Sequence, residues 1–302
     1  MTTWDLLAST WSWEPSILGG CVGLLGAYFA ILRSRASGRS FYYVLGVVVL
    51  LLALVSPIDT LGEQYLFSIH MLQHMLLVLV VPPLLLLGIP AWVGRDLLSM
   101  RFAGRAEHWL SRPVIAWTAG VATLWIWHLP ILYNAALVHQ DIHILEHESF
   151  LVTATIFWWP VVTPVEQLRL PPLSAIVYLS LGMASESILG IILTFAPVGF
   201  YPSYLHPFDT FGALSLVRQG WGISAEIDQQ VGGLLMWIGG SAIFLIAILG
   251  ALNRWYATVE EDEEELLQAG AAQLIPVRGR IDSVAEQAGA MRSFRELQRV
   301  DE

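Results

Sequence analysis

The stretch YLFSIHMLQHMLLVLVVPPLLLLG, residues 65–88, is apolar along most of its length and yet contains two histidines, His70 and His74. Its length matches the roughly 20 residues that a helix needs to cross the hydrocarbon of a membrane. The i, i+4 spacing places both rings on one face of that helix, roughly 6 Å apart, where two imidazoles can share one metal ion. Imidazoles in hydrocarbon are costly and usually functional. The stretch therefore predicts a membrane-embedded transition-metal site.

The composition of the whole chain also indicates a membrane protein. Of its 302 residues, 56% are hydrophobic and only 13% are charged, which lies outside the range of ordinary soluble domains. The 13 tryptophans and 9 tyrosines are residues that gather at membrane interfaces. The formal net charge of −10 owes much to the run EEDEEE at 260–265, and without a basic patch we expect no nucleic-acid partner.

The single cysteine, Cys21, limits the redox and metal chemistry. One cysteine cannot form an internal disulfide, so the fold has no disulfide framework. A CxxC or CxxxC motif for carrying copper is excluded as well. The sequence therefore does not resemble the copper carriers that use cysteine ligands.

Apolar runs of roughly 17–25 residues predict an all-α, polytopic membrane protein built as a bundle of seven transmembrane helices. The expected spans cover about 15–32, 41–56, 65–88, 113–133, 143–162, 173–196 and 229–252. Pro82 and Pro83 are expected to break the third span below its histidines. We divide the chain into a transmembrane domain at 1–256 and an acidic tail at 257–302, which is expected to be solvated and partly disordered.

The arginines set the expected orientation of the bundle. All but one fall on the same side of the expected spans, namely Arg33, Arg35, Arg39, Arg95, Arg101, Arg105, Arg112, Arg169, Arg254 and the five in the tail. Arg218 falls on the other side. The positive-inside rule then predicts an outer N-terminus and a cytoplasmic C-terminus. Arginines follow the first span and none precedes it, so we expect that span to be retained rather than cleaved.

The longest outer connection, roughly residues 197–228, is rich in proline, glycine and aromatic residues. Such a composition favours a packed segment over a loose linker. We expect this connection to cover the outer end of the bundle, where it is a candidate lid or docking surface.

A second histidine pair and one further histidine accompany the first pair. His143 and His147 open the run HILEHESFLVTATIFWW at 143–159, and His128 lies in WIWHLP at 125–130. The other histidines are expected on loops, with His108 on the cytoplasmic side and with His139 and His206 on the outer side. One membrane histidine alone is more often a packing residue, but this many together predict the ligation of a metal or a haem.

The expected depths of these histidines are similar. Counting about 1.5 Å per residue from the outer end of each span places His70, His128 and His147 in one layer. His74 then lies one turn deeper and His143 one turn shallower. Because the layer draws on three different spans, it predicts one shared site.

The residues beside the first pair bear on which metal is held. The run HMLQHM places Met71 and Met75 next to His70 and His74. Imidazole together with thioether favours copper, and Cu(I) prefers the sulfur. Met71 lies three residues before His74 and near its face, while Met75 points farther round. Methionine is also a routine apolar filler, so Met71 is a candidate ligand and no more.

Three carboxylates are candidates for further roles. Glu146 makes residues 143–147 read H-x-x-E-H, a signature of zinc hydrolases in which the glutamate is the general base. Glu186, in MASESILG, lies near mid-membrane and serves there as a ligand, a proton relay or a neutral hydrogen-bonded acid. Asp228 opens the last span, where capping of the helix N-terminus is favoured over metal ligation.

Four motifs taken together resemble one known family. HMLQHMLLVLVVPPLLLLG, WHLPILYNAA, HILEHESFLVTATIFWWPVV and DQQVGGLLMW, in this order over roughly residues 15–253, are similar to the CtaG family of caa-type cytochrome c oxidase assembly factors. The resemblance implies a multi-pass plasma-membrane protein of bacteria or archaea, not an enzyme, that supplies copper to a subunit of a haem–copper oxidase. The matching family histidines are His70, His74, His128, His143 and His147, and the matching acid is Asp228. Met71 and Glu186 complete the set of candidate metal ligands.

Three alternatives remain open at this point. A haem could be held axially by His70 or His74 on one side and by His128 or His147 on the other. An intramembrane zinc hydrolase would use Glu146 as its base, and it needs an open metal position and a route for water. A structural scaffold for oxidase assembly would need no metal at all.

Overall fold

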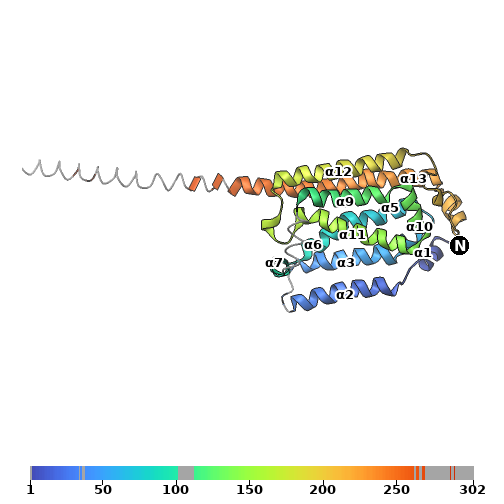
Figure 1. The fold of residues 1–302 in the computed structure, drawn as a ribbon, viewed down its shortest axis with the longest axis horizontal. Helices are drawn as coiled ribbons and strands as arrows, with labels where there is room; N and C mark the ends of the chain where they lie inside the picture. Colours follow the sequence, from blue (N-terminus) through green and yellow to red (C-terminus); the bar gives the residue numbers. More distant parts are fainter. Residues whose placement is uncertain are drawn as a thin grey trace, which may run out of the picture. The chain divides into compact units, whose positions relative to one another are not determined.

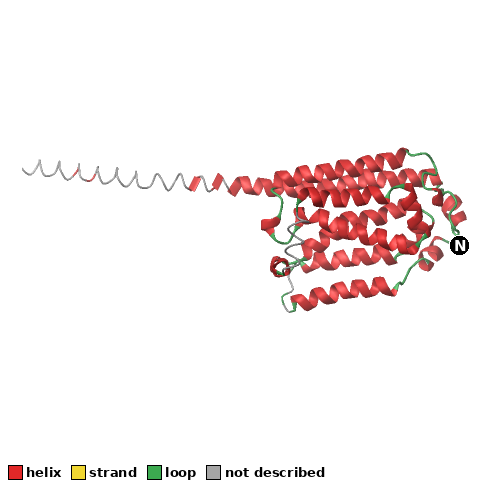
Figure 2. Ribbon diagram, viewed as in Figure 1, coloured by secondary structure: helices red, strands yellow, loops and turns green. Residues whose placement is uncertain are grey.

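The computed structural model describes residues 2–33, 35, 38–100, 112–261, 263–264, 267–268, 286 and 289. Over these residues the regular secondary structure is helical and includes no strand (Figure 2), which confirms the predicted all-α class. Arg101, Arg105 and His108 lie outside the described residues, as does most of the tail.

Two compact units divide the chain, residues 1–249 and residues 250–302. The division falls within the helix Ala225–Glu261, and so does the boundary predicted after residue 256. The first unit contains the histidine clusters and is described below (Figure 1). The described residues of the second unit are helical.

The described helices of the first unit can be given in chain order. In order they are α1 (Thr3–Ser9), α2 (Pro15–Leu32), α3 (Ser40–Val55), α4 (Pro57–Gln64), α5 (Phe67–Met75), η1 (Leu76–Val80), α6 (Val81–Gly88), α7 (Ala91–Ser99), α9 (Pro113–Trp127), α10 (Pro130–Val138), α11 (Gln140–Val162), η2 (Glu166–Leu168), α12 (Pro172–Phe195), η3 (Pro202–Tyr204), η4 (Leu216–Gly220), α13 (Ala225–Leu234) and η5 (Leu235–Gly240). Proline is the first residue of α2, α4, α9, α10 and α12, where its missing N–H and fixed φ suit a helix start.

The described helices include several that can cross a membrane. Four are long and apolar enough by themselves, namely Pro15–Leu32, Phe67–Gly88, Pro172–Phe195 and Ala225–Glu261. The number rises to six if the bent pairs α3 with α4 and α9 with α10 each count as one span. The protein is therefore a polytopic helical membrane protein. The predicted span that is not among these six is the fifth, 143–162, which corresponds to α11; the first turns of α11 carry three acidic residues, and the count of seven stays a prediction.

The span predicted at 113–133 corresponds to two helices with a bend between them rather than to one continuous helix. α9 ends at Trp127, and α10 begins at Pro130 after a bend of 72°. Pro130 cannot donate a hydrogen bond to α9, and it favours an extended conformation at Leu129, where φ is −64° and ψ is 129°. His128 therefore lies where the chain turns.

The third span passes its two prolines without breaking, which corrects the expectation of a break at Pro82 and Pro83. Phe67–Gly88 is one helix of 22 residues. Pro82 has no N–H for the carbonyl of Val78, and the indole Nε1 of Trp158 on α11 donates to that oxygen at 2.9 Å. The π-helical turn η1 absorbs the irregularity directly after the histidine pair.

Glycines let α13 lie close to two other helices. A methyl group at Gly233 would overlap Thr194 of α12, and a methyl group at Gly232 would overlap Phe67 of α5. Close approach of backbones at small residues is the usual packing of membrane helices. It brings the first turn of α13 next to the start of α5, the helix that carries the first histidine pair.

Residues 196–224, between α12 and α13, form a packed segment that we call the cap. Tyr201 and Tyr204 are buried, which confirms the expectation of a packed segment. The guanidinium of Arg218 donates to the carbonyls of Ile223 and Tyr204, both at 2.9 Å, and so fixes the path of the chain. Figure 1 shows the cap at the same end of the first unit as α1 and α10, opposite α7.

Candidate metal centre

Two histidines of α5 face each other at the centre of the candidate site. The Nε2 atoms of His70 and His74 lie 2.7 Å apart, and the ring planes make an angle of 87°. Both side chains are buried, at 0% and 2% exposure. The i, i+4 spacing does bring both rings to one face of the helix, as the sequence predicts.

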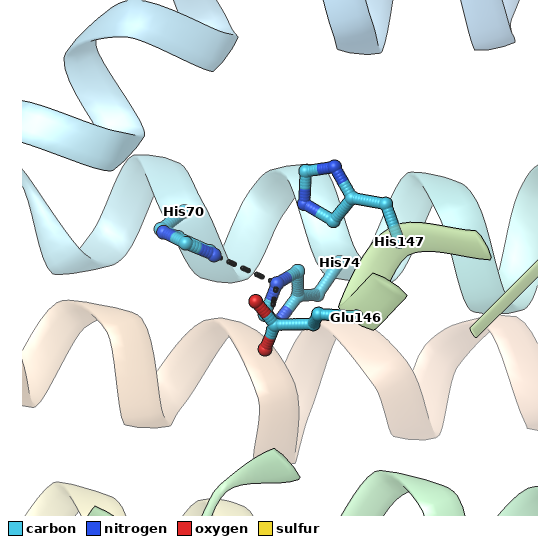
Figure 3. Close-up of side chains that lie close together, drawn as sticks. All are labelled: His70, His74, Glu146 and His147. Carbon is cyan, nitrogen blue, oxygen red and sulfur yellow. Dashed lines mark hydrogen bonds and ion pairs between the residues drawn. The ribbon is translucent and has the colours of Figure 1, made fainter. Parts of the chain in front are cut away.

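A neighbouring helix completes a group of four ligand atoms, which we call the His–Glu quartet. α11 contributes Glu146 and His147, and one ligand atom from each of these and from His70 and His74 lies within 4.8 Å of all the others (Figure 3). The Oε1 atom of Glu146 is 3.7 Å from Nε2 of His74. Three imidazoles and a carboxylate are a donor set that proteins use for transition metals.

Several polar atoms of the quartet are buried without a hydrogen bond. They are Nδ1 of His74, Nε2 of His147 and both carboxyl oxygens of Glu146. A buried polar atom without a partner is costly, and nearly all such atoms in proteins are satisfied. A cation bound between these groups would satisfy several of them at once, so the residues present fit a metal ion.

His128 lies beside the quartet rather than within it. Its Nδ1 atom is 2.7 Å from the carbonyl oxygen of Leu124 on its own helix. Because a carbonyl only accepts, Nδ1 carries the proton, and Nε2 keeps a lone pair that is buried without a hydrogen bond. The ring centroid is 5.6 Å from that of His74. Of the predicted layer of His70, His128 and His147, the quartet therefore includes the first and the last, and His128 lies next to His74.

His143 lies on the other side of the quartet. Its ring centroid is 4.1 Å from that of His147 and 5.6 Å from that of His70. Its Nδ1 atom lies 3.9 Å from Oε1 of Glu63 on α4. All five histidines predicted as ligands therefore gather in one region, three in the quartet and two beside it.

A tyrosine of the cap holds one histidine of the quartet in place. The hydroxyl of Tyr204 donates to the carbonyl of Gly62 at 2.8 Å and lies 3.1 Å from Nδ1 of His70. Burial raises the pKa of this hydroxyl well above its usual value, so it stays protonated. Sequence reasoning missed Tyr204, although the aromatic composition of the cap was a signal that pointed to this segment.

Asp228 caps a helix, but not the helix that the sequence suggests. Its carboxylate accepts hydrogen bonds from the backbone N–H groups of Phe67 and Ser68 at 2.8 and 3.0 Å, and from the Ser68 hydroxyl at 2.6 Å. These are free donors at the start of α5, whereas α13 is capped by the side chain of Ser224. Asp228 thus positions the helix of the first histidine pair and is not among the quartet.

The two remaining candidates also lie outside the quartet. Met71 is fully buried in an apolar cluster that includes Phe67, Tyr133 and Phe150. Glu186 on α12 is 5% exposed and lines a cavity of about 30 Å³, room for about one water molecule. The residue that the structure adds to the quartet is Glu146, which the H-x-x-E-H pattern marks only as a possible base.

The fold and the site together define a polytopic helical membrane protein with a buried cluster of metal-ligating side chains. Comparison with protein families then identifies it more closely. The chain belongs to the cytochrome c oxidase caa3 assembly factor family (Caa3_CtaG), whose family model matches residues 26–258. This finding confirms the resemblance seen in the four sequence motifs.

The chain is also similar to uncharacterised proteins of mycobacteria. It is 26% identical over 254 residues to a protein of Mycobacterium leprae, which covers 78% of this chain and 37% of that protein. It is 27% identical over 273 residues to proteins of Mycobacterium bovis and Mycobacterium tuberculosis, which covers 80% of this chain and 39% of each. The chain thus spans less than two-fifths of the length of these curated relatives. No solved structure matches it.

Proposed function

We propose that this chain is a cytochrome c oxidase assembly factor of the bacterial plasma membrane that binds copper at the His–Glu quartet and supplies it to a subunit of a haem–copper oxidase. One observation carries the proposal, namely the convergence of three imidazoles and a carboxylate within 4.8 Å in a membrane protein of this family. Copper is the cargo in this role, and no substrate bond is made or broken, so the protein is not an enzyme.

The donor set supports copper as that cargo. Nitrogen and oxygen donors bind Cu²⁺ more tightly than they bind Zn²⁺ or other divalent metals of the first row, by the Irving–Williams order. Imidazole is a ligand for copper and zinc alike, so the family assignment decides between them. A haem–copper oxidase requires copper, and this requirement favours copper as the cargo of a factor that assembles it.

The distribution of arginines supports a quartet in the outer half of the membrane. Arg39 precedes α3, Arg95 lies in α7 and Arg169 precedes α12, all at the end of the first unit away from the cap. The positive-inside rule assigns that end to the cytoplasm. The cap and the histidines then face the outside, with α11 as a further span that brings the total to seven, and copper reaches them from there.

The test is the copper content of the full chain, purified without added metal and again after loading with Cu(I). The expected result is bound copper that falls sharply in His74→Ala and His147→Ala. It should be unchanged in His206→Ala, which removes an exposed histidine of the cap. Full copper content in both quartet variants at unchanged thermal stability would overturn the site. A Soret band or stoichiometric zinc would instead support the haem or the zinc alternative.

A further inference from the structure

A large cavity reaches the quartet from the side of α2. Its volume is about 1110 Å³, and α2, α3, α4 and α11 all contribute to its walls. Toward α7 the walls are apolar, with residues such as Cys21, Leu24 and Leu50. Toward the cap the walls are polar. The exposed residues Glu14 and Glu148 mark the place where this polar end meets the surface.

The charged residues at the polar end of the cavity are carboxylates. Glu14, Asp59, Glu63 and Glu148 line it, and no lysine or arginine is among the described residues that line the cavity. A concave surface that carries one sign of charge between walls of low polarity concentrates ions of the opposite sign. The cavity is therefore suited to collecting cations.

One buried histidine turns this acidic end into a candidate site. His143 lines the cavity and is 3% exposed, and its Nε2 atom is buried without a hydrogen bond. Its Nδ1 atom faces Oε1 of Glu63 at 3.9 Å. Asp59, the other acid on α4, already accepts a hydrogen bond from Gln73 at 2.8 Å. Glu63 is thus the acid that is placed to share a cation with His143.

The same cavity leads directly to the quartet. His147 is both a lining residue of the cavity and a member of the quartet. Its ring centroid is 4.1 Å from that of His143, one helical turn away on α11. A cation bound to His143 is therefore one helical turn of α11 away from His147, a ligand of the quartet.

We propose that the cavity is the vestibule through which the metal cation reaches the protein, and that Glu63 and His143 form a first, transient site that loads it. The cation then passes to His147 and the quartet by exchange of ligands. Each step breaks one bond from nitrogen or oxygen to the metal as another forms, with no change of oxidation state. The inference rests on the proposed function, because it assumes that the quartet is the destination.

The rate of loading tests this inference separately from the binding itself. The full chain in detergent micelles or nanodiscs is mixed with Cu(I) held by bicinchoninate, and the absorbance of that complex is followed as copper transfers to the protein. Glu63→Gln and His143→Gln should reach the copper content of the wild type, but about tenfold more slowly, because each variant removes one ligand of the site that first captures the cation, and capture in a charged vestibule raises the on-rate by about this order. Equal final content also shows that the variants are folded.

The matched controls remove one carboxylate and one imidazole that lie at the same end of the first unit but outside the cavity. Glu226→Gln removes an exposed acid of α13 that does not line the cavity, and His206→Gln removes an exposed histidine of the cap. Both should load at the rate of the wild type. The double variant Glu63→Gln/His143→Gln should load no more slowly than the slower single variant, because the two residues hold one ion.

The outcomes separate the two proposals. If wild type binds copper, His74→Ala loses it, and Glu63→Gln and His143→Gln load at the normal rate, the transient site is overturned while the copper function stands. If the two substitutions slow loading independently, the rate of the double variant falls by the product of the two single effects. That result would also overturn a site that the two residues form together. A lower final content in His143→Gln at normal rate would assign His143 to the resident site instead. A wild-type protein that binds no copper would overturn the proposed function, and the vestibule with it.

Discussion

The Nδ1 atom of His70 lies 3.1 Å from the hydroxyl oxygen of Tyr204, which is 134 positions further along the chain. Because the hydroxyl proton is directed to the carbonyl of Gly62, the oxygen of Tyr204 accepts the Nδ1 proton of His70. The Nε2 atom of His70 is then left with a lone pair that faces the quartet. The cap thus sets the tautomer of a candidate ligand, in the way that outer hydrogen bonds orient metal-binding histidines.

Tyr204→Phe should weaken copper binding without unfolding the protein. The phenyl ring keeps the packing of the cap, but His70 loses the acceptor that fixes its tautomer. Loss of such an outer hydrogen bond lowers metal affinity by about 10- to 100-fold. Competition between the protein and a Cu(I) chelator measures this change. Tyr42→Phe, at an exposed tyrosine of α3, is the control and should bind as wild type does. Equal affinity in both variants would mean that Tyr204 is a packing residue only.

Asp228→Ala should lower the thermal stability of the protein more than it lowers copper affinity. The change leaves the N–H groups of Phe67 and Ser68 without an acceptor, and loss of a helix cap costs about 1 kcal/mol. Thermal unfolding in detergent is the measurement, with Glu226→Ala as a control in the same turn of α13. If Asp228 were a metal ligand, Asp228→Asn would abolish copper binding while it preserved most of the stability. That result would restore Asp228 to the candidate ligands.

The limits of two spans, α2 and α12, could be predicted closely from the sequence because chemistry along the chain sets them, whereas the last helix, Ala225–Glu261, extends beyond the predicted 229–252 at both ends. α2 begins at Pro15 and ends at Leu32, as predicted, since a proline opens the apolar run and Arg33 ends it. α12 follows its prediction within one residue at each end for a similar reason. The face shared by His70 and His74 is fixed by the helical repeat alone. The helix ends and the shared histidine face depend on residues close together in the chain, so they can be predicted from the sequence.

The contacts between helices could not be predicted in the same way. Asp228 caps α5 rather than its own helix because glycines of α13 allow that helix to pack tightly against α5, which no periodicity reveals. Glu146 enters the quartet because α11 is rotated to point this residue at His74. Pro82 leaves its helix unbroken because a tryptophan of another helix satisfies the freed carbonyl. Rotation and approach of helices decide the ligand set, and both are properties of the packed bundle.

Glu146→Gln should discriminate between oxidation states of copper. A carboxylate is a hard, charged ligand, and its loss weakens binding of Cu²⁺ more than that of Cu(I), which prefers soft donors. We expect the affinity for Cu²⁺ to fall by at least about tenfold more than that for Cu(I), which corresponds to about 1.4 kcal/mol. Glu148→Gln is the control, because it removes an exposed acid two residues away. Its equilibrium affinities for Cu²⁺ and Cu(I) should match those of the wild type. Equal losses for the two ions would show that Glu146 acts through the fold rather than as a ligand.

Glu186 should take no part in the copper site, and two variants test this. One variant replaces the carboxyl, and the other displaces it. Glu186→Gln keeps the shape of the side chain, and the carboxyl lies outside the quartet, so copper content and thermal stability should match wild type. Gly240→Ala should displace the carboxyl, because the added methyl group would overlap the end of the flexible Glu186 side chain, which borders a small cavity and can shift; copper content should again match wild type. Copper content and thermal unfolding of both proteins, together with oxidase activity in membranes that carry them, are the measurements. Normal copper with lowered oxidase activity in Glu186→Gln would assign the carboxyl a proton-relay role. Lost copper in a folded Glu186→Gln would place it among the ligands and contradict the separation.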